Sequence, residues 1–473
     1  RTHAGHSPFF LIQRTPFDAM TQPTTGLTAA LANYTAAPRF GAAEADACAI
    51  AQTGFIDTIA TMLAGQNEPV TQLMLQHLGT PGQAGEAPVP FAKRSLSASN
   101  AACINGVAGH ALDYDDVALS AHTSTVLVPA ILAEGHRLGI SGLEALRAYV
   151  VGYEVWAELF GREADQYHLK GWHPTGVFGT VGAAAAVAYL NRLSPAQTQT
   201  ALSIAASLAS GLVANFGTMT KPVHAGRAAA NGMEAVRLAV RGLTAAPDIF
   251  EHPAGYLTAI SPAGKVDRHR AASQLGQTPR ILDTGLSIKR YPVCYSGHRI
   301  IDGVLSIVER ENLQADAVRE VCITIGPAQA SMLRNARPKT GLEAKFSAEF
   351  AVASALVARQ VGLAQLSDSF VNRADVQAQL AKVRIAITDK PDPIDPAFSF
   401  ADRVQISTTD GRDFDTGDIR FALGNAKNPI GSADLRQKFM DCLAVGGASA
   451  GGDALYARLA SLSTLTDLRT LFA

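Results

Sequence analysis

The sequence lacks the paired cysteines that a disulfide framework or a thiolate metal site would need. Its five cysteines are scattered over 473 residues, and no two of them form a Cys-x-x-Cys pair. This pattern is typical of a reducing compartment, so we expect a cytoplasmic protein without disulfides. The sequence also has no apolar run of about 18 residues, the length that a membrane-spanning helix needs, and we expect no membrane partner.

An excess of charge of either sign is also missing. The 40 Lys and Arg residues oppose 41 Asp and Glu residues, which leaves a net charge of −1. Without a basic excess the chain is not expected to bind nucleic acid, and a near-neutral surface favours an oligomer. Charged residues make up only 17% of the chain and hydrophobic residues 47%, a balance that excludes disorder as the main state.

The common nucleotide-binding motifs do not occur either. There is no GxGxxG stretch and no P-loop, so we expect no nicotinamide or nucleotide cofactor. Residues 1–19 precede Met20 and lack the basic start, apolar centre and cleavage site of a signal peptide. We interpret residues 1–19 as an expression leader and expect the native chain to begin at Met20.

What the sequence does contain, up to residue 284, is a series of helical patterns. Apolar residues recur at three- and four-residue spacing in residues 44–64, as in an amphipathic helix. Ser141 with Glu144 is a capping-box pattern, and Ser194 precedes a proline that suits a first helical turn. Few strand patterns interrupt this region, so residues 20–284 are expected to form a large all-helical domain. Further helices are predicted over residues 97–112, 141–159, 179–190, 194–212 and 228–242.

The pattern changes in residues 285–420, where we expect a smaller α+β domain. Short β-branched alternations predict strands, and Asp410-Gly411 predicts a hairpin turn between the last two of them. Helical patterns resume near the end, so residues 421–473 are expected to pack back on the helical domain. The predicted fold class is therefore mainly α. The predicted strands are 321–325, 383–387, 404–408 and 413–416, with helices at 347–359, 376–381, 433–443 and 454–462.

Side chains suited to catalysis gather in four polar breaks between apolar helices. The first break contains Asp113 and His122, and the second contains Tyr167 and His173 directly before a predicted helix. A helix start lowers the pKa of a histidine, which favours a neutral base. Each residue alone fits a structural or solvated role, but their grouping favours a functional site. Histidine and aspartate also bind zinc, yet their spacing matches no ligand pattern, so no metal is expected.

The third and fourth breaks are rich in positive charge. Lys221 precedes Pro222, which predicts an extended segment at this point of the chain. Cations beside hydroxyl groups can hold an anion, where the alternative is a solvated surface loop. The fourth break lies at the expected domain junction, a favoured place for ligand pockets. The side chains expected to bind substrate in these two breaks are Thr218, His224, Arg227, Arg290, His298 and Arg299.

A pocket lined by His, Lys, Arg and Tyr suits acid–base chemistry on a small polyanion. The residues alone therefore predict an enzyme that abstracts a proton next to a carboxylate, without a redox cofactor or a metal. A relative that binds the same ligand without catalysis is the alternative, because a fold does not imply a function.

Five stretches of the chain resemble the MmgE/PrpD family. They are GHALDYDD with a following histidine, GWHPTGVFGTVGAAAA, FGTMTKPVHAGRAA, KRYPVCYSGH and KFSAEFAVA, in the order that the family shows. The resemblance implies a large helical domain with a smaller α+β domain, a homodimer, and activity without a metal or organic cofactor. Members include 2-methylcitrate dehydratase, cis-aconitate decarboxylase and iminodisuccinate epimerase, which all transfer protons on small di- or tricarboxylates.

The resemblance also assigns residues and favours one reaction. Asp113, His122, His173 and Lys221 match active-site positions of the family. Val117 stands where the dehydratase and decarboxylase members resemble one another in carrying Thr, and Phe350 stands at a position that resembles a Tyr of the decarboxylase. We therefore expect an iminodisuccinate epimerase-like reaction, with a dehydratase or decarboxylase as the alternative.

Epimerisation needs one group to remove a proton and a second to return it on the opposite face. His173 is predicted to act on one face of the substrate. Tyr167 or Lys221 is predicted to act on the other, with His122 behind them.

Overall fold

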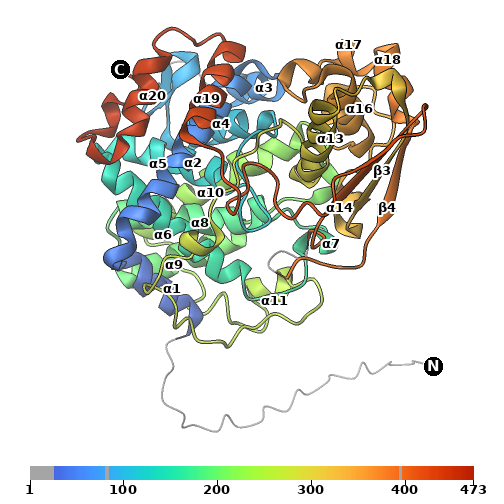
Figure 1. Cartoon of the computed structure of the whole chain (residues 1–473). Helices are drawn as coiled ribbons and strands as arrows, with labels where there is room; N and C mark the ends of the chain where they lie inside the picture. The colour runs from blue at the N-terminus through green and yellow to red at the C-terminus, as the bar shows by residue number, and fades with distance from the viewer. Residues whose placement is uncertain (1–25, 80–84, 394–396) are drawn as a thin grey trace, which may run out of the picture.

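The computed structural model describes residues 26–79, 85–393 and 397–473 (Figure 1). The interpreted leader, residues 1–19, and Met20 lie outside the described residues. A large helical part occupies one side of the molecule and a smaller part with a sheet occupies the other (Figure 1). This confirms the predicted fold class.

The large part is built around two long buried helices, α8 and α10, which pack on each other and on α4 and α6. Gly226 in α10 explains how closely α10 lies against α4: a Cβ added there would be 2.3 Å from the Cys103 carbonyl oxygen. This contact brings the start of α10 beside the end of α4. The helices of this part are α1 (Leu27–Ala36), α2 (Glu44–Ala64), α3 (Pro69–Leu78), α4 (Ala98–Ala111), α5 (Ser124–Leu138), α6 (Gly142–Phe160), α7 (Tyr167–Lys170), α8 (Pro174–Leu190), α9 (Pro195–Leu208), α10 (Thr220–Val240), α11 (Tyr256–Ile260) and α12 (Ile281–Thr284).

Helix starts follow the capping signals closely. The Ser141 hydroxyl accepts from the Glu144 backbone N–H, and the Glu144 carboxylate accepts from the Ser141 N–H, which confirms the capping box of α6. Ser194 and Gln197 form the same reciprocal pair at α9. α9 ends at Leu208, four residues before the predicted end.

Two predictions for this part are wrong. Lys221 does not lie in an extended segment but in the first turn of α10. Proline is tolerated there because the first helical N–H groups have no intrahelical partner, so Pro222 loses nothing. The region is also not purely helical, since β1 (Ala87–Val89) and β2 (Arg94–Leu96) form a small antiparallel ribbon beside α4 and α5.

The smaller part is a four-stranded sheet with order β4-β3-β5-β6. β3 and β4 are parallel, and β5 and β6 form the antiparallel hairpin that Asp410-Gly411 predicted. α13 and α16 pack on the sheet through a shared apolar core that includes Val304, Val352 and Ile323. The elements are α13 (His298–Arg310), β3 (Val318–Ile325), α14 (Pro327–Met332), α15 (Gly341–Ala344), α16 (Ala348–Ala358), α17 (Asp368–Val371), α18 (Ala374–Leu380), β4 (Val383–Ile387), β5 (Arg403–Thr408) and β6 (Asp413–Asp415).

The chain returns to the helical part at its end. α19 (Ser432–Gly446) packs along α2, where Phe439 and Cys442 join the core that contains Phe55 (Figure 1). α20 (Gly452–Ala460) also contacts α2. The segment Gly41–Asn67, which contains α2, is long and apolar enough to cross a membrane, but 78% of its most apolar window is buried inside the fold. Its apolar character is thus explained by core packing.

Candidate active site

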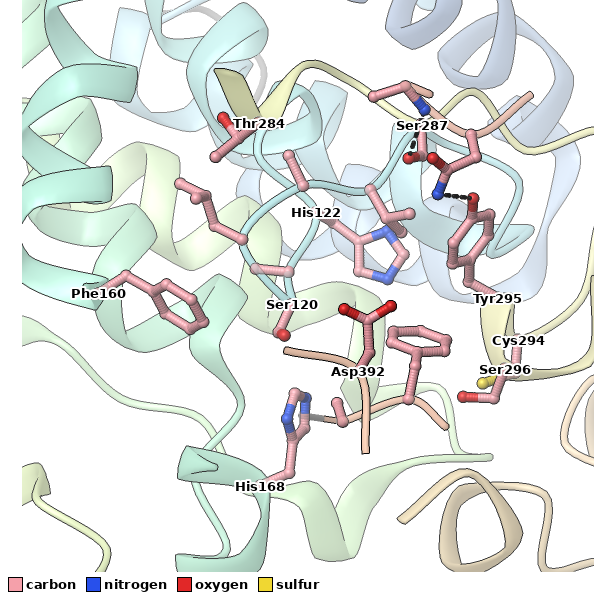
Figure 2. A pocket seen from close by; sticks show the side chains of 18 of the residues that line it. Ser120, His122, Phe160, His168, Thr284, Ser287, Cys294, Tyr295, Ser296 and Asp392 are labelled. Carbon is pink, nitrogen blue, oxygen red and sulfur yellow. Dashed lines mark hydrogen bonds between the residues drawn. The ribbon is translucent and has the colours of Figure 1, made fainter. Parts of the chain in front are cut away.

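A cavity of about 460 Å³ lies where the two parts of the molecule meet, with walls from both (Figure 2). Its volume suits a small metabolite. Asp113, His173 and Lys221 come from the helical part, whereas Arg299 and Phe346 come from the α+β part. Six basic side chains line it against three carboxylates, and three of the six also pair with carboxylates behind the lining, Glu154, Glu158 and Asp402. The lining groups are Lys221, Arg270, Arg280, Lys289, Arg299 and Lys427, with Asp113, Asp283 and Asp392.

Asp113 lies in the turn after α4 and carries a clamp of two lysines. Its φ of +53° is a left-handed conformation that aspartate tolerates better than most residues. Its Oδ1 is 2.6 Å from the Lys221 Nζ and 3.0 Å from the Lys289 Nζ. The Lys289 ammonium also donates to the Asp113 carbonyl oxygen at 2.7 Å. Burial alone would raise the pKa of Asp113, but the two lysines hold it well below 3.8, so the carboxylate stays ionised.

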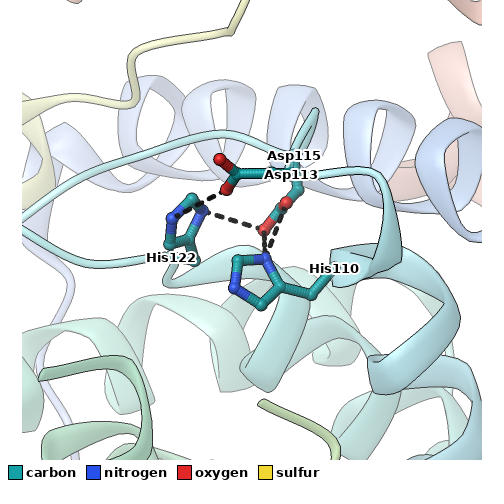
Figure 3. Close-up of side chains that lie close together, drawn as sticks. All are labelled: His110, Asp113, Asp115 and His122. Carbon is teal, nitrogen blue, oxygen red and sulfur yellow. Dashed lines mark hydrogen bonds and ion pairs between the residues drawn. The ribbon is translucent and has the colours of Figure 1, made fainter. Parts of the chain in front are cut away.

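Asp115 bridges two buried histidines on the same loop (Figure 3). Its carboxylate lies 2.9 Å from the Nδ1 of His110 and 3.0 Å from the Nδ1 of His122. Burial lowers the pKa of His110 to about 3 and also lowers the pKa of His122, so both rings are neutral at pH 7. A neutral ring that donates its Nδ1–H to a carboxylate keeps an unprotonated Nε2. The His122 ring lies between two carboxylates, with its Nδ1 3.0 Å from Asp115 and its Nε2 3.6 Å from Asp113.

The same four side chains could offer ligand atoms to a metal ion, since His110, Asp113, Asp115 and His122 have donor atoms within 4.8 Å of one another. Two lysine ammonium groups already lie against Asp113, however, and neutralise its charge. A divalent cation would have to approach these two positive charges at close range, which opposes its binding.

His173 is the N-cap residue of α8 and lies at the back of the cavity. Burial, with Lys221 and the neighbouring histidines, holds its pKa well below 6.5, in agreement with the neutral form that its helix-start position predicted. Its Nδ1 is 3.0 Å from the Nδ1 of His224. The edge of its ring meets Phe216, whose face also lies 5.2 Å from the Lys221 Nζ.

Tyr167 is not in the cavity, so the prediction that it converges with the other residues is wrong. Its ring is 1% exposed and packs against Phe160 and Phe178 in the apolar core. Burial raises the pKa of its hydroxyl, which is opposite to what a base would need. The α7 turn directs this side chain inward, and sequence spacing alone could not reveal that.

The six predicted substrate-binding residues divide into three groups. Arg299 does line the cavity, and its guanidinium donates to the Ser399 carbonyl oxygen at 2.9 Å. His298 and His224 lie just behind the wall: His298 is fully buried between Tyr291 and Tyr295, and His224 contacts His173. The remaining three are exposed side chains outside the cavity lining, because their positions on the helix or loop face solvent. They are Thr218, Arg227 and Arg290.

Sequence reasoning missed two lysines of the site. Lys289 is the second cation that contacts Asp113. The sequence feature that could have identified it is its position next to Arg290 in the stretch KRYPVCYSGH. Lys345 lies next to the cavity residue Phe346 and contacts the Ala111 carbonyl oxygen at 3.4 Å. Burial lowers the pKa of Lys345 to about 8, within reach of physiological pH.

Two models of one protein family match this chain. The MmgE/PrpD N-terminal domain model matches residues 29–269, and the MmgE/PrpD C-terminal domain model matches residues 291–454. The chain therefore belongs to the MmgE/PrpD family, whose known members include enzymes.

Curated relatives in this family are lyases by name. The chain is 30% identical over 361 residues to the cis-aconitate decarboxylase of Homo sapiens, and the aligned residues cover 73% of this chain and 72% of that protein. It is 30% identical over 359 residues to the cis-aconitate decarboxylase of Mus musculus, covering 73% and 71%. It is 26% identical over 409 residues to that of Aspergillus terreus, covering 81% and 82%. These relatives favour the lyase alternative over the epimerase expectation.

The structure also weakens one argument for the epimerase. Phe350 was expected to remove a hydroxyl from the site, but its ring is fully buried in the core between α16 and α18 and is not part of the cavity lining. Val117 does line the cavity, where its backbone pairs with Ser287. Only one of the two sequence departures therefore touches the space that a substrate would fill.

Proposed function

We propose that this protein is a metal-independent lyase that decarboxylates a small unsaturated tricarboxylate of the cis-aconitate type. The observation that carries the proposal is the cavity itself: two lysines on Asp113, two neutral histidines and further arginine and lysine side chains around a volume fit for a small ligand. The decarboxylase relatives support the same reaction class.

The proposed chemistry needs electrostatic binding and one proton. The bond from a substrate carbon to its carboxylate breaks, CO₂ leaves, and the electron pair shifts through the neighbouring double bond to a carbon that takes a proton. Lys221, Lys289 and Arg299 are placed to hold the remaining carboxylates and the negative charge that develops. His173 is placed to supply the proton, and His122 lines the cavity beside it.

The test is release of CO₂ from cis-aconitate by the purified protein. We expect turnover by the unaltered chain and a loss of about 10² to 10⁴-fold in His173→Ala. The matched control is His77→Ala, which removes an exposed histidine on α3 far from the lining residues. The proposal is wrong if the unaltered protein binds cis-aconitate without releasing CO₂.

The same assay separates the other readings. Deuterium exchange into iminodisuccinate, with inversion of its stereocentre and no CO₂, would favour the epimerase. Binding without any exchange would favour a non-catalytic carboxylate-binding relative. A homodimer and a cytoplasmic location stay predictions, and light scattering on the purified protein tests the first.

A further inference from the structure

The contact between His173 and His224 has a chemical consequence. The two Nδ1 atoms are 3.0 Å apart, so one of them must carry the proton that the other accepts. His173 is 1% exposed and lines the cavity, whereas His224, on the first turns of α10, is half-buried and lies outside the lining. The pair thus connects the interior of the cavity with the solvent side of α10.

The surroundings of the pair restrict its protonation. Lys221, His110 and His122 lie close to His173, and Lys221 and His110 also act on His224. These positive and titratable neighbours, together with burial, oppose an imidazolium at His173. If His173 is to donate a proton, it must do so as a neutral ring that carries hydrogen on Nε2. Its Nδ1 is then an acceptor, and the His224 Nδ1–H is the donor that faces it.

We propose that His224 is a proton-relay residue that keeps His173 in its Nε2–H form and returns a solvent proton to it in each turnover. The inference rests on the proposed decarboxylation, which consumes one proton. His122 is a second neutral imidazole of the cavity, with Asp115 and Asp113 on its two ring nitrogens.

The relay step balances without any co-reactant other than water. The His173 Nε2–H passes to the substrate carbon as the carbon–carboxylate bond breaks and CO₂ leaves. The His224 Nδ1–H moves to the His173 Nδ1, and the His224 Nε2 takes a proton from water. Both rings stay neutral. The water that gives the proton leaves as hydroxide, which balances the one proton that decarboxylation consumes. Further proton exchange of each ring with water restores the starting tautomers.

The first test reads the protons directly and does not depend on turnover. Nitrogen NMR of histidine-labelled protein at pH 7, with His173→Gln and His224→Asn for assignment, should show hydrogen on Nε2 of His173 and on Nδ1 of His224. Hydrogen on Nδ1 of His173 in the resting protein would overturn the relay, whatever the activity of the enzyme.

The second test distinguishes a proton-relay role of His224 from a purely structural role. His224→Asn keeps an N–H donor toward the His173 Nδ1 but cannot pass a proton on, and His224→Leu removes both functions. We expect kcat for CO₂ release to fall about 10 to 100-fold in both, with KM within about twofold for His224→Asn and partial rescue of kcat by added imidazole. His77→Asn, on the exposed face of α3, is the control. A purely structural role would not give imidazole rescue.

The outcomes distinguish the two proposals. If the unaltered protein releases CO₂ while His224→Asn keeps its kcat, the relay is wrong and the proposed function stands. If the unaltered protein releases no CO₂ from cis-aconitate, the proposed function fails, and the NMR result alone decides whether His224 sets the His173 tautomer.

Discussion

Lys438→Met should destabilise the protein strongly, because it breaks a buried ion pair behind the active-site loop. The Lys438 Nζ lies 2.6 Å from the Asp57 Oδ1, and the two side chains are 5% and 0% exposed. The same ammonium donates to the Tyr114 carbonyl oxygen at 2.7 Å and lies 4.0 Å from the centre of the Tyr114 ring. Lys438, on α19, therefore holds the loop that carries Asp113 and Asp115.

The magnitude follows from two independent estimates. Removing one partner of a buried pair costs about 3 to 5 kcal/mol. Alternatively, Asp57 can escape its unpaired charge by taking up a proton, which at pH 7 costs about 4 kcal/mol for a carboxyl with an ordinary pKa near 3.9. The two figures agree, so we expect a loss of about 4 kcal/mol in the free energy of unfolding.

The pH dependence of this loss is the sharper test. Burial already raises the folded-state pKa of Asp57 in the unaltered protein, against the opposing effect of Lys438, and loss of this cation in Lys438→Met raises it further. Stability from such a group is present at low pH and is lost as pH rises. The difference between the unaltered protein and the variant should therefore shrink by up to about 1.4 kcal/mol per pH unit below pH 7.

Urea unfolding followed by circular dichroism, at pH 7 and pH 5.5, measures both quantities. Asp57→Asn combined with Lys438→Met serves as the matched control, because removing both charges should recover much of the loss. A single variant that costs less than about 1 kcal/mol, or a cost that does not change with pH, would refute the reasoning.

Three further outcomes are expected. Tyr167→Phe should keep kcat within about twofold, because its hydroxyl lies in the core; a 100-fold loss in the CO₂ assay would return Tyr167 to the mechanism. Asp113→Asn should raise KM and lower kcat about 10² to 10³-fold, since Lys221 and Lys289 would lose the charge that positions them; unchanged steady-state kinetics would argue against the clamp. The protein should lose stability as pH falls below about 6.5, because His168 and His224, with pKa values lowered to about 4, stay neutral when folded but take up protons when unfolded. Both side chains are only half-buried, so each adds less than about 1.4 kcal/mol per pH unit; a flat melting profile from pH 7 to 5 would contradict this.

The sequence by itself determined several of the helices, the hairpin and part of the site. Local signals suffice for these features: a capping box depends on residues three apart, and the alternation of a strand is visible within five residues. Four polar breaks also identified Asp113, His122, His173 and Lys221, which the fold does bring to one cavity. Charged and histidine side chains between apolar helices are costly to bury unless they pair with one another, and such pairing brings them to one polar site.

Tertiary structure decided which of these side chains face the substrate space. Tyr167 and His173 are six residues apart, yet Tyr167 packs in the core and His173 lines the cavity. Lys289 contacts Asp113 across 176 residues of sequence, and Lys438 contacts the same loop from α19. Such contacts depend on how distant elements pack. The sequence therefore supplied the chemical groups, and long-range packing of the helices determined their partners and their protonation.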